Sequence, residues 1–173
     1  RFSLGGEFGF NLKSTALYRD TSAWYHVCVA FDSTQGTASN RVKAYINGVQ
    51  LTSFDTATYL SQNANVGLFG ETNGDHYIGW SDAQLKGMYV AEFHALDGIV
   101  VDATDFGEFD EDSGIWKPKA YAGTYGTEGY YFNFDNASSL GADSSGNSNN
   151  AISLSGIDAA NQATDTPTNN FCT

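Results

Sequence analysis

The chain has 173 residues, with 3 Trp, 10 Tyr, 12 Phe and 19 Gly but only 2 Pro, and its 20 Asp and Glu against 8 Lys and Arg set the net charge at −12. This apolar and aromatic content excludes a disordered chain, and no apolar run approaches the roughly 20 residues of a membrane helix. The acidity argues against nucleic acid and anionic lipid as partners, because both bind through Lys and Arg. We therefore expect no nucleic-acid partner and no membrane insertion. Because the chain opens on Arg1 and holds one Met, we interpret it as part of a longer or processed polypeptide.

The N-terminal part is predicted to form short strands. Residues 1–11 alternate Gly with Phe and Leu, as a half-buried strand pair does, and residues 16–19 form a short strand. Residues 24–32 are apolar on both faces, which is typical of a strand in the middle of a sheet. We expect Cys28 to pack there as a small apolar group, and Cys28 and Cys172 to be free thiols.

A hairpin is predicted over residues 41–54. Val42, Ala44 and Ile46 alternate with polar or larger side chains, and Asn47-Gly48 then interrupts the pattern. Asn-Gly favours a type I′ turn, because such a turn needs two consecutive positive φ angles.

Three further strands are predicted before residue 96. They cover residues 66–69, 76–80 and 85–95, with an Asn73-Gly74 turn between the first two. In the last of them Glu92 and His94 are expected on one face. Short strands at hairpin spacing indicate an antiparallel sandwich or barrel.

The composition of the chain changes after residue 96. Residues 97–112 hold seven of the twenty acids, and residues 102–106 are predicted to form one helical turn with Asp102 as N-cap. Residues 116–119 are expected to be extended, and residues 129–135 to form a final aromatic strand. Beyond residue 136 the Ser, Gly, Asn and Asp composition predicts an irregular tail.

Four segments, in this order, carry a resemblance to a known fold: residues 24–32 (WYHVCVAFD), 41–49 (RVKAYINGV), 77–79 (YIG) and 87–93 (GMYVAEF). They resemble the laminin-G-like, concanavalin A-like jelly roll. The resemblance implies an all-β fold, an antiparallel jelly-roll β-sandwich over residues 1–135, with an irregular C-terminal tail over residues 136–173. The strands that open such a jelly roll are expected to precede residue 1, so that residues outside this chain or a neighbouring subunit complete the sheet.

A narrower resemblance covers most of the chain. Its segments are residues 93–98 (FHALDG), 105–109 (DFGEF), 114–118 (GIWKP), 125–130 (YGTEGY), 143–147 (DSSGN) and 165–171 (DTPTNNF). They look like structural proteins of marine bacteriophages, cyanophages especially. This resemblance implies a non-enzymatic virion protein of a fibre, an appendage or the capsid surface. Its partners would be other virion subunits, in a homo-oligomer or a larger assembly on the particle surface.

Acidic residues suggest two further chemistries. Glu108, Asp110 and Asp112 resemble the catalytic signature of jelly-roll glucanases, which need two carboxylates roughly 5 Å apart. The flanking Gly107 and Ser113-Gly114 favour a solvated acidic loop instead, so we expect no enzymatic activity. Calcium stays open as a cofactor, because carboxylate and amide oxygens are its usual ligands. Two stretches offer them: Asp143, Asn147 and Asn149, or Asp110 and Asp112.

Sugar recognition uses an aromatic face with amide or carboxylate partners. Two groups of residues match this requirement: Asn73 with Tyr77 and Trp80, and Trp116 with Tyr121 and Tyr125. The sequence therefore predicts a virion protein whose lectin-like jelly roll serves assembly and contacts host glycans. The alternative is a carbohydrate-binding module or glycanase-like domain of a secreted enzyme.

Overall fold

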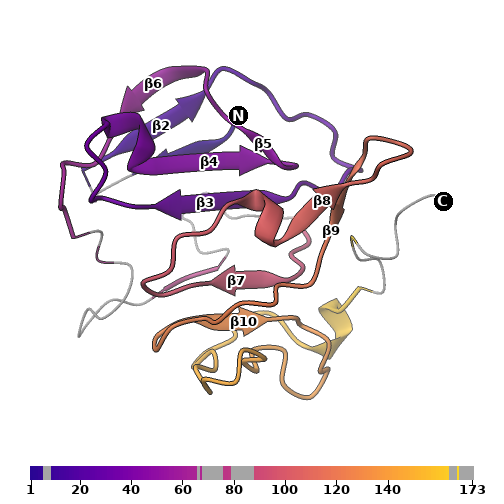
Figure 1. Cartoon of the computed structure of the whole chain (residues 1–173). Coiled ribbons are helices and arrows are strands. Elements are labelled where there is room, and N and C mark those ends of the chain that lie inside the picture. The colour runs from indigo at the N-terminus through magenta and orange to yellow at the C-terminus, as the bar shows by residue number, and fades with distance from the viewer. Residues whose placement is uncertain (6–8, 66, 68–75, 79–87, 164–166, 168–173) are drawn as a thin grey trace. The chain divides into compact units, whose positions relative to one another are not determined.

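The computed structural model describes residues 1–5, 9–65, 67, 76–78, 88–163 and 167. Within them the protein is all-β, as predicted: it has ten short strands in small antiparallel sheets, three 3-10 turns and no α-helix (Figure 1). No helix in this part of the chain is long and apolar enough to cross a membrane.

The chain forms two compact units. Unit 1 comprises Arg1–Val66 and Val100–Ala122, and unit 2 comprises Gly67–Ile99 and Gly123–Thr173. The division drawn from the sequence, a jelly roll over residues 1–135 and a tail over residues 136–173, stays a prediction.

The first sheet of unit 1 contains β1 (Ser3–Gly5), β2 (Asn11–Ser14) and β6 (Phe54–Thr58), with β2 in the middle. The predicted strand pair at the N-terminus is present, although its second strand begins at Asn11 and extends beyond the predicted range. Leu12 in β2 is fully buried, in a cluster with Phe10, Val42 and Leu60. Burial of these side chains supplies the main apolar stabilisation of unit 1.

The second sheet of unit 1 contains β3 (Val27–Phe31), β4 (Val42–Ile46) and β5 (Val49–Gln50). Asn47 and Gly48 have φ angles of 47° and 77°, which confirms the type I′ turn between β4 and β5. The alternation predicted along β4 is also confirmed, because its first, third and fifth residues are buried.

Strand β3 is shorter than the predicted range 24–32, and among the described strands it pairs with β4. Its predicted place in the middle of a sheet stays a prediction. Cys28 is a free and buried thiol, as predicted. Burial, together with the nearby Asp102 and Asp105 carboxylates, raises the pKa of Cys28 to about 12.

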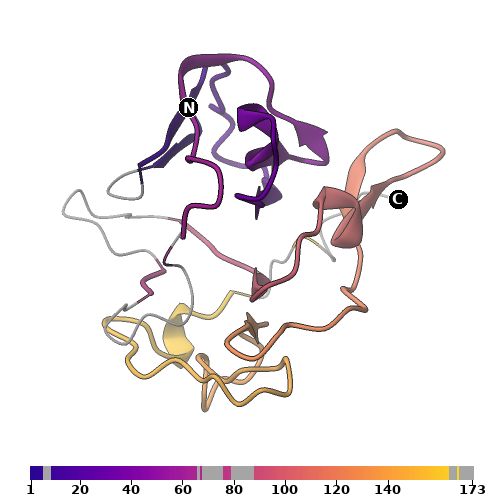
Figure 2. The same cartoon turned by 60° about the vertical axis from the view of Figure 1, so that its left-hand side comes forward.

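The other described elements of unit 1 are the 3-10 turn η1 (Ala38–Asn40), between β3 and β4, and a second 3-10 turn followed by a hairpin: η2 (Ala103–Asp105), β8 (Gly107–Phe109) and β9 (Trp116–Pro118). Figure 2 shows η2 leading directly into this hairpin. Asp102 caps η2 as predicted, since its carboxylate accepts from the Thr104 N–H while the Asp105 carboxylate accepts from the Asp102 N–H.

Unit 2 contains β7 (Phe93–Ala95), β10 (Tyr130–Phe132) and the 3-10 turn η3 (Ala159–Asn161). β7 covers only the last three residues of the strand predicted over residues 85–95, and residues 88–92 are not in a strand. Glu92 has a φ of 51°, a left-handed conformation that interrupts an extended strand. The strands predicted at residues 66–69 and 76–80, and the turn between them, lie largely outside the described residues.

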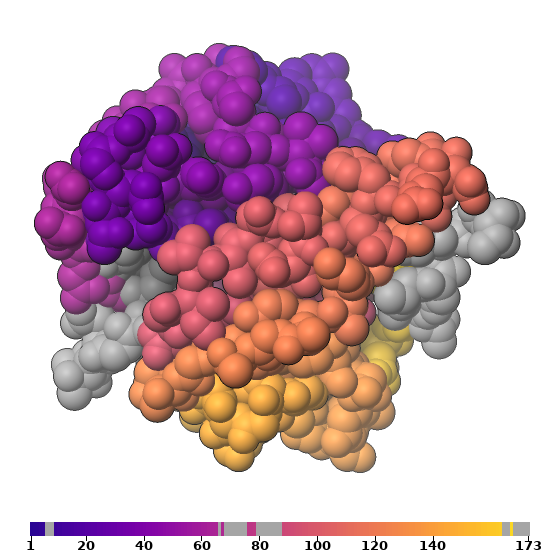
Figure 3. Space-filling model, viewed as in Figure 1, coloured from indigo at the N-terminus to yellow at the C-terminus, as the bar shows by residue number. Residues whose placement is uncertain are grey.

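The described residues after residue 136 form no strand, as predicted, and only Leu140 and Gly141 among them are buried. In the space-filling view residues 123–163, coloured from orange to yellow, form one continuous mass (Figure 3). Side-chain hydrogen bonds hold this segment in place of a regular ladder, and the polar residues that predict a loop are the ones that make them.

Candidate functional site

The sheet formed by β7 and β10 has two chemically different faces. Phe93 lies opposite Phe132 and His94 lies opposite Tyr131, so successive pairs point to opposite sides. Phe93, Tyr130 and Phe132 form stacked aromatic contacts on the first side, and Phe132 is buried. The second side carries imidazole and phenol groups, which can both stack and hydrogen-bond.

Three nearly parallel rings occupy this second side. The His94 and Tyr131 rings stack with centroids 4.2 Å apart and planes 7° from parallel. The Tyr125 ring lies 6.0 Å from His94 and 6.2 Å from Tyr131, at 12° and 9°. The Tyr125 hydroxyl and His94 Nδ1 are 2.9 Å apart, in a hydrogen bond whose direction depends on the imidazole tautomer. We call His94, Tyr125 and Tyr131 the polar aromatic face.

Glu92 directly precedes β7 in the chain. It is half-buried, and among the described residues none donates a hydrogen bond to its side chain. Burial raises the pKa of Glu92. The pKa of Tyr131 is raised as well, first by burial and then by the charges of Glu92 and Asp135.

Two glycines shape the loop that carries Tyr125. Gly126 has a φ of 74°, and a Cβ there would collide with the Asp97 carbonyl oxygen. A Cβ at Gly129 would collide with the Tyr125 carbonyl oxygen. The Tyr-Gly-Thr-Glu-Gly-Tyr run thus needs glycine at both positions for the loop to turn this tightly.

The loop over residues 143–147 holds the segment over residues 126–131 by hydrogen bonds. The Asp143 carboxylate accepts from the N–H groups of Tyr131, Ser145 and Asn149 and from the Ser145 hydroxyl, at 2.8–2.9 Å. The Asn147 side-chain amide donates to the carbonyls of Gly126 and Gly129. These bonds fix the backbone on which two of the three rings are mounted.

The Asn149 side-chain amide adds donors to the same loop. It bonds the carbonyls of Thr127 and Gly129 at 3.0 and 2.9 Å. Asp143, Asn147 and Asn149, the residues considered as calcium ligands, thus all hydrogen-bond within this loop and its neighbour. In the part of the chain that the structure describes, no group of three or more His, Cys, Asp or Glu side chains is arranged to hold a metal ion.

The structure describes four of the six residues predicted to bind sugar. Asn73 and Trp80 lie outside the described residues, and Tyr77 is 59 % exposed in the short stretch 76–78. Trp116 and Tyr121 belong to unit 1, whereas Tyr125 belongs to the polar aromatic face of unit 2.

Trp116 lies in the interior of unit 1. It is only 9 % exposed, and its ring occupies space that a Cβ at Gly48 or Gly107 would enter. Its Nε1 and the Nδ1 of His26 are buried without a hydrogen-bond partner among the described groups, and the two rings are 5.6 Å apart. Tyr121 is half-buried and stacks on Phe106 at 4.9 Å.

Two members of the candidate site were not among the predicted sugar-binding residues: His94 and Tyr131. The sequence did place Glu92 and His94 on one strand face, and Tyr131 in an aromatic strand. The missing signal was the pairing register of β7 with β10, which brings His94 opposite Tyr131.

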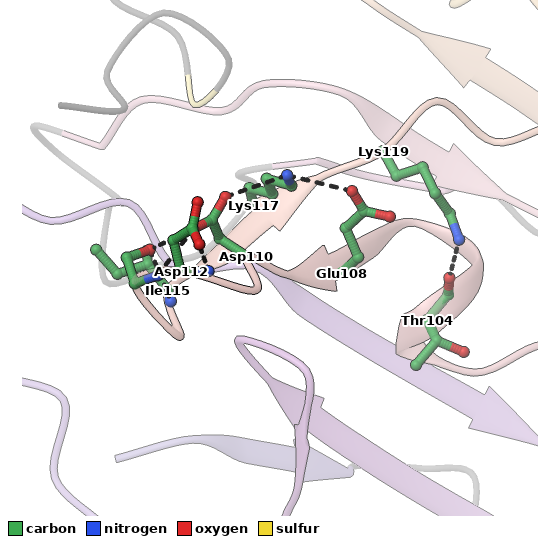
Figure 4. A network of polar contacts seen from close by, with 8 residues as sticks. Thr104, Glu108, Asp110, Asp112, Ile115, Lys117 and Lys119 are labelled. Atoms are coloured by element: carbon green, nitrogen blue, oxygen red, sulfur yellow. Dashed lines mark hydrogen bonds and ion pairs between the residues drawn. The ribbon is translucent and has the colours of Figure 1, made fainter. Parts of the chain in front are cut away.

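The acidic run that resembles a glucanase signature forms a salt-bridged hairpin (Figure 4). Lys117 Nζ lies 3.3 Å from both the Glu108 and the Asp110 carboxylates. Asp110 also accepts from the N–H groups of Asp112 and Ser113, and hydrogen bonds from Ser113 and Lys117 lower its pKa to about 2. Glu108 lies in β8 and Asp112 in the turn that follows, so the three acids do not lie along one strand.

The chain matches no protein-family model, no curated protein and no solved structure in comparisons with each.

Proposed function

We propose that this chain is a non-enzymatic structural protein of a bacteriophage virion, located in a fibre, an appendage or the capsid surface. In this proposal its short strands form part of a lectin-like jelly roll, which serves assembly with other virion subunits and contacts host glycans. The support for the virion role is the resemblance of segments such as residues 125–130 and 143–147 to phage structural proteins. The all-β structure with small antiparallel sheets is compatible with it.

The observation that carries the glycan role is the polar aromatic face. A sugar ring presents C–H groups on one side and hydroxyls around its edge, so it is bound by an aromatic plane with polar atoms beside it. His94, Tyr125 and Tyr131 form a half-buried stack of nearly parallel rings, with imidazole nitrogens and phenol hydroxyls at its edges. The loops held by Asp143 keep these rings in position without a ligand, which lowers the entropic cost of binding.

The acidic hairpin gives no support to a glycanase. A retaining glycosidase needs one carboxylic acid that keeps its proton near neutral pH. Glu108 and Asp110 share the Lys117 cation, and Asp112 lies in the turn beyond β8, so the three acids do not form the pair along one strand that such an enzyme uses. Turnover of β-glucans by the native chain, lost in Glu108→Gln, would instead favour the secreted-enzyme alternative.

The glycan role is tested by binding of the whole chain to a glycan array, followed by titration calorimetry on the best sugar. Tyr125→Ala removes one ring of the polar aromatic face, and we expect about tenfold weaker binding, because an aromatic contact contributes about 1.5 kcal/mol. The matched control is Tyr18→Ala, which removes a half-buried tyrosine that packs against Tyr25 and is not among the predicted sugar-binding residues, and which should leave binding unchanged. Equal loss in both variants would contradict the assignment of the site.

The virion role is tested separately. Antibodies or quantitative mass spectrometry should find the chain in purified phage particles at a fixed number of copies per particle. Its presence only in the culture fluid would contradict the virion role and leave a secreted module.

A further inference from the structure

We infer that His26 forms a pH-sensitive contact inside unit 1: while its imidazole is neutral, the segment over residues 102–119 stays packed on the sheet of β3, β4 and β5, and protonation of the imidazole releases this segment locally. The inference is independent of the glycan and virion roles proposed above. It follows from the rings around His26 and from two buried nitrogen atoms without a hydrogen-bond partner.

Trp116 of β9 packs where the hairpin meets the sheet. Its ring fills the space that a Cβ would enter at Gly48, in the turn between β4 and β5, or at Gly107, in β8. The backbone of His26 is bonded to the same turn: its N–H donates to the Asn47 side-chain oxygen at 2.8 Å, and its carbonyl accepts from the Asn47 N–H at 2.9 Å. The centroids of the His26 and Trp116 rings are 5.6 Å apart, so the two rings meet at the junction of hairpin and sheet.

Each of these two rings buries a nitrogen that has no hydrogen-bond partner. Trp116 Nε1–H can only donate, whereas Nδ1 of a neutral imidazole accepts in one tautomer and donates in the other. In an imidazolium both nitrogens are donors. Protonated His26 would therefore place a second buried N–H beside that of Trp116, with no acceptor for either among the described residues. A buried polar group without a partner costs free energy, and a charged one costs more.

The sheet offers no anion to offset this cost. Strand register places Cys28, Tyr45 and Lys43 on the same face as His26. Burial raises the pKa of Cys28 and that of Tyr45, so both groups are neutral between pH 5.5 and 7.5, and Lys43 is positive. In the described part of the chain no hydrogen bond or salt bridge joins the His26 ring to a charged side chain.

The charged groups of the packed segment have other partners or lie in its exposed turn. Lys117 pairs with Glu108 and Asp110, and register directs Glu108 and Lys117 to the side of the hairpin opposite to Trp116. The remaining charged groups cap η2, bond its backbone or lie in the exposed turn: Asp102, Asp105, Lys119, Glu111 and Asp112. An imidazolium at His26 would thus have no paired carboxylate among the described residues.

One interaction opposes release. The rings of Trp116 and Phe106, the latter 6.4 Å from His26, would attract an imidazolium through their π systems. This attraction is smaller than the cost of removing water from an unpaired charge, and burial accordingly lowers the pKa of His26. Release of the segment hydrates the imidazolium, so proton uptake favours release. A hairpin without its packing is only marginally stable, and its own hydrogen bonds should then open more often.

Hydrogen exchange of the whole chain, measured by mass spectrometry at pH 7.5 and pH 5.5, tests the inference. Protection factors, which remove the pH dependence of intrinsic exchange, should fall about three- to tenfold at pH 5.5 for residues 107–118. About tenfold is the limit for one proton over this range when the unfolded-state pKa is about 6.5. The amides of β2 should stay at least about tenfold better protected than those of the hairpin, and low urea should leave exchange of the hairpin unchanged, because local release exposes little surface.

His26→Phe and His26→Gln both remove the proton-binding group, and each should give residues 107–118 equal protection at the two pH values within about twofold. Two replacements are used so that a folding defect in one of them, visible by circular dichroism at pH 7.5, leaves the other informative. His94→Phe is the matched control, because His94 is another half-buried histidine stacked on aromatic rings, in unit 2. This control should keep the full pH effect.

The outcomes are distinct. Protection of the hairpin that is constant or rises at pH 5.5 in the native chain would mean that the π attraction prevails, and it overturns the inference. A fall that persists in both His26 variants assigns the effect to other groups and overturns the role of His26. A hairpin that exchanges no faster than β2, or whose exchange rises steeply in low urea, opens only by global unfolding, and this result overturns local release.

Discussion

Replacement of Asp143 by alanine should unfold the scaffold of the candidate site. The Asp143 carboxylate accepts four hydrogen bonds, from three backbone N–H groups and one hydroxyl, at 2.8–2.9 Å. A hydrogen bond to a charged group contributes about 1.5–3 kcal/mol when it is buried. Because Asp143 is half-exposed and water replaces part of these bonds, we expect the free energy of unfolding to fall by about 3 kcal/mol.

The pH dependence gives this prediction a second readout. Burial is the largest single influence and raises the pKa of Asp143, but the hydrogen bonds from Tyr131, Ser145 and Asn149 together outweigh it and lower the pKa below 3.8. A carboxyl group with a lowered folded-state pKa stabilises the fold above its unfolded pKa and loses that effect as the pH falls. The stability difference between the native chain and Asp143→Ala should therefore be full at pH 6 and shrink below about pH 4.

Urea unfolding followed by circular dichroism measures this difference, and amide hydrogen exchange reports on Tyr131, whose N–H bonds Asp143. Asp158→Ala is the matched control. Asp158 caps the short turn η3 through the Ala160 N–H, so its loss should cost only about 1 kcal/mol. Equal losses in the two variants, or a loss for Asp143→Ala that is the same at pH 6 and pH 3, would refute the reasoning.

Three further predictions concern unit 1. Gly48→Ala should lower the free energy of unfolding by more than about 2 kcal/mol, because Gly48 has a φ of 77° and a Cβ there would enter the Trp116 ring. Urea titration measures this loss, and an unchanged unfolding midpoint would contradict the packing of Trp116 on Gly48. Burial lowers the pKa of His26, so stability should decrease as the pH falls below about 6.5, where the unfolded chain takes up the proton first, and His26→Phe should remove that slope. Cys28 has a pKa of about 12, so its thiol should not be alkylated by iodoacetamide at pH 8 until urea unfolds the chain. Peptide mass spectrometry measures the alkylation, and rapid labelling of the folded protein would argue against burial of Cys28.

Local signals in the sequence predicted local structure well. Asn47-Gly48 forms the type I′ turn, because both residues tolerate positive φ and no distant contact is needed. Asp102 caps a single turn for the same reason, since its partner lies two residues away. The alternation in residues 42–46 correctly identified the buried face of β4, because side-chain direction in a strand has a period of two.

Predictions failed where the outcome depended on partners distant in the chain. The strand expected over residues 85–95 is reduced in the described residues to Phe93–Ala95, since apolar character cannot reveal the left-handed conformation of Glu92. Trp116 was predicted to bind sugar from its residue type, which cannot show that its ring fills the space left by Gly48 and Gly107; its sugar role stays a prediction. Tyr125 was predicted in the same way and does lie on a polar face, because Asn147 and Asp97 bond its loop.

The sequence by itself determined the all-β class, the hairpin turn, the helical cap and the irregular polar tail, because each depends on the conformational preferences of a few neighbouring residues. Only the tertiary structure decided which aromatic side chains are buried and which share a polar face. That choice depends on strand register: the pairing of Phe93–Ala95 with Tyr130–Phe132 brings His94 opposite Tyr131, and residues 143–149 hold the adjoining loop by hydrogen bonds between segments far apart in the chain.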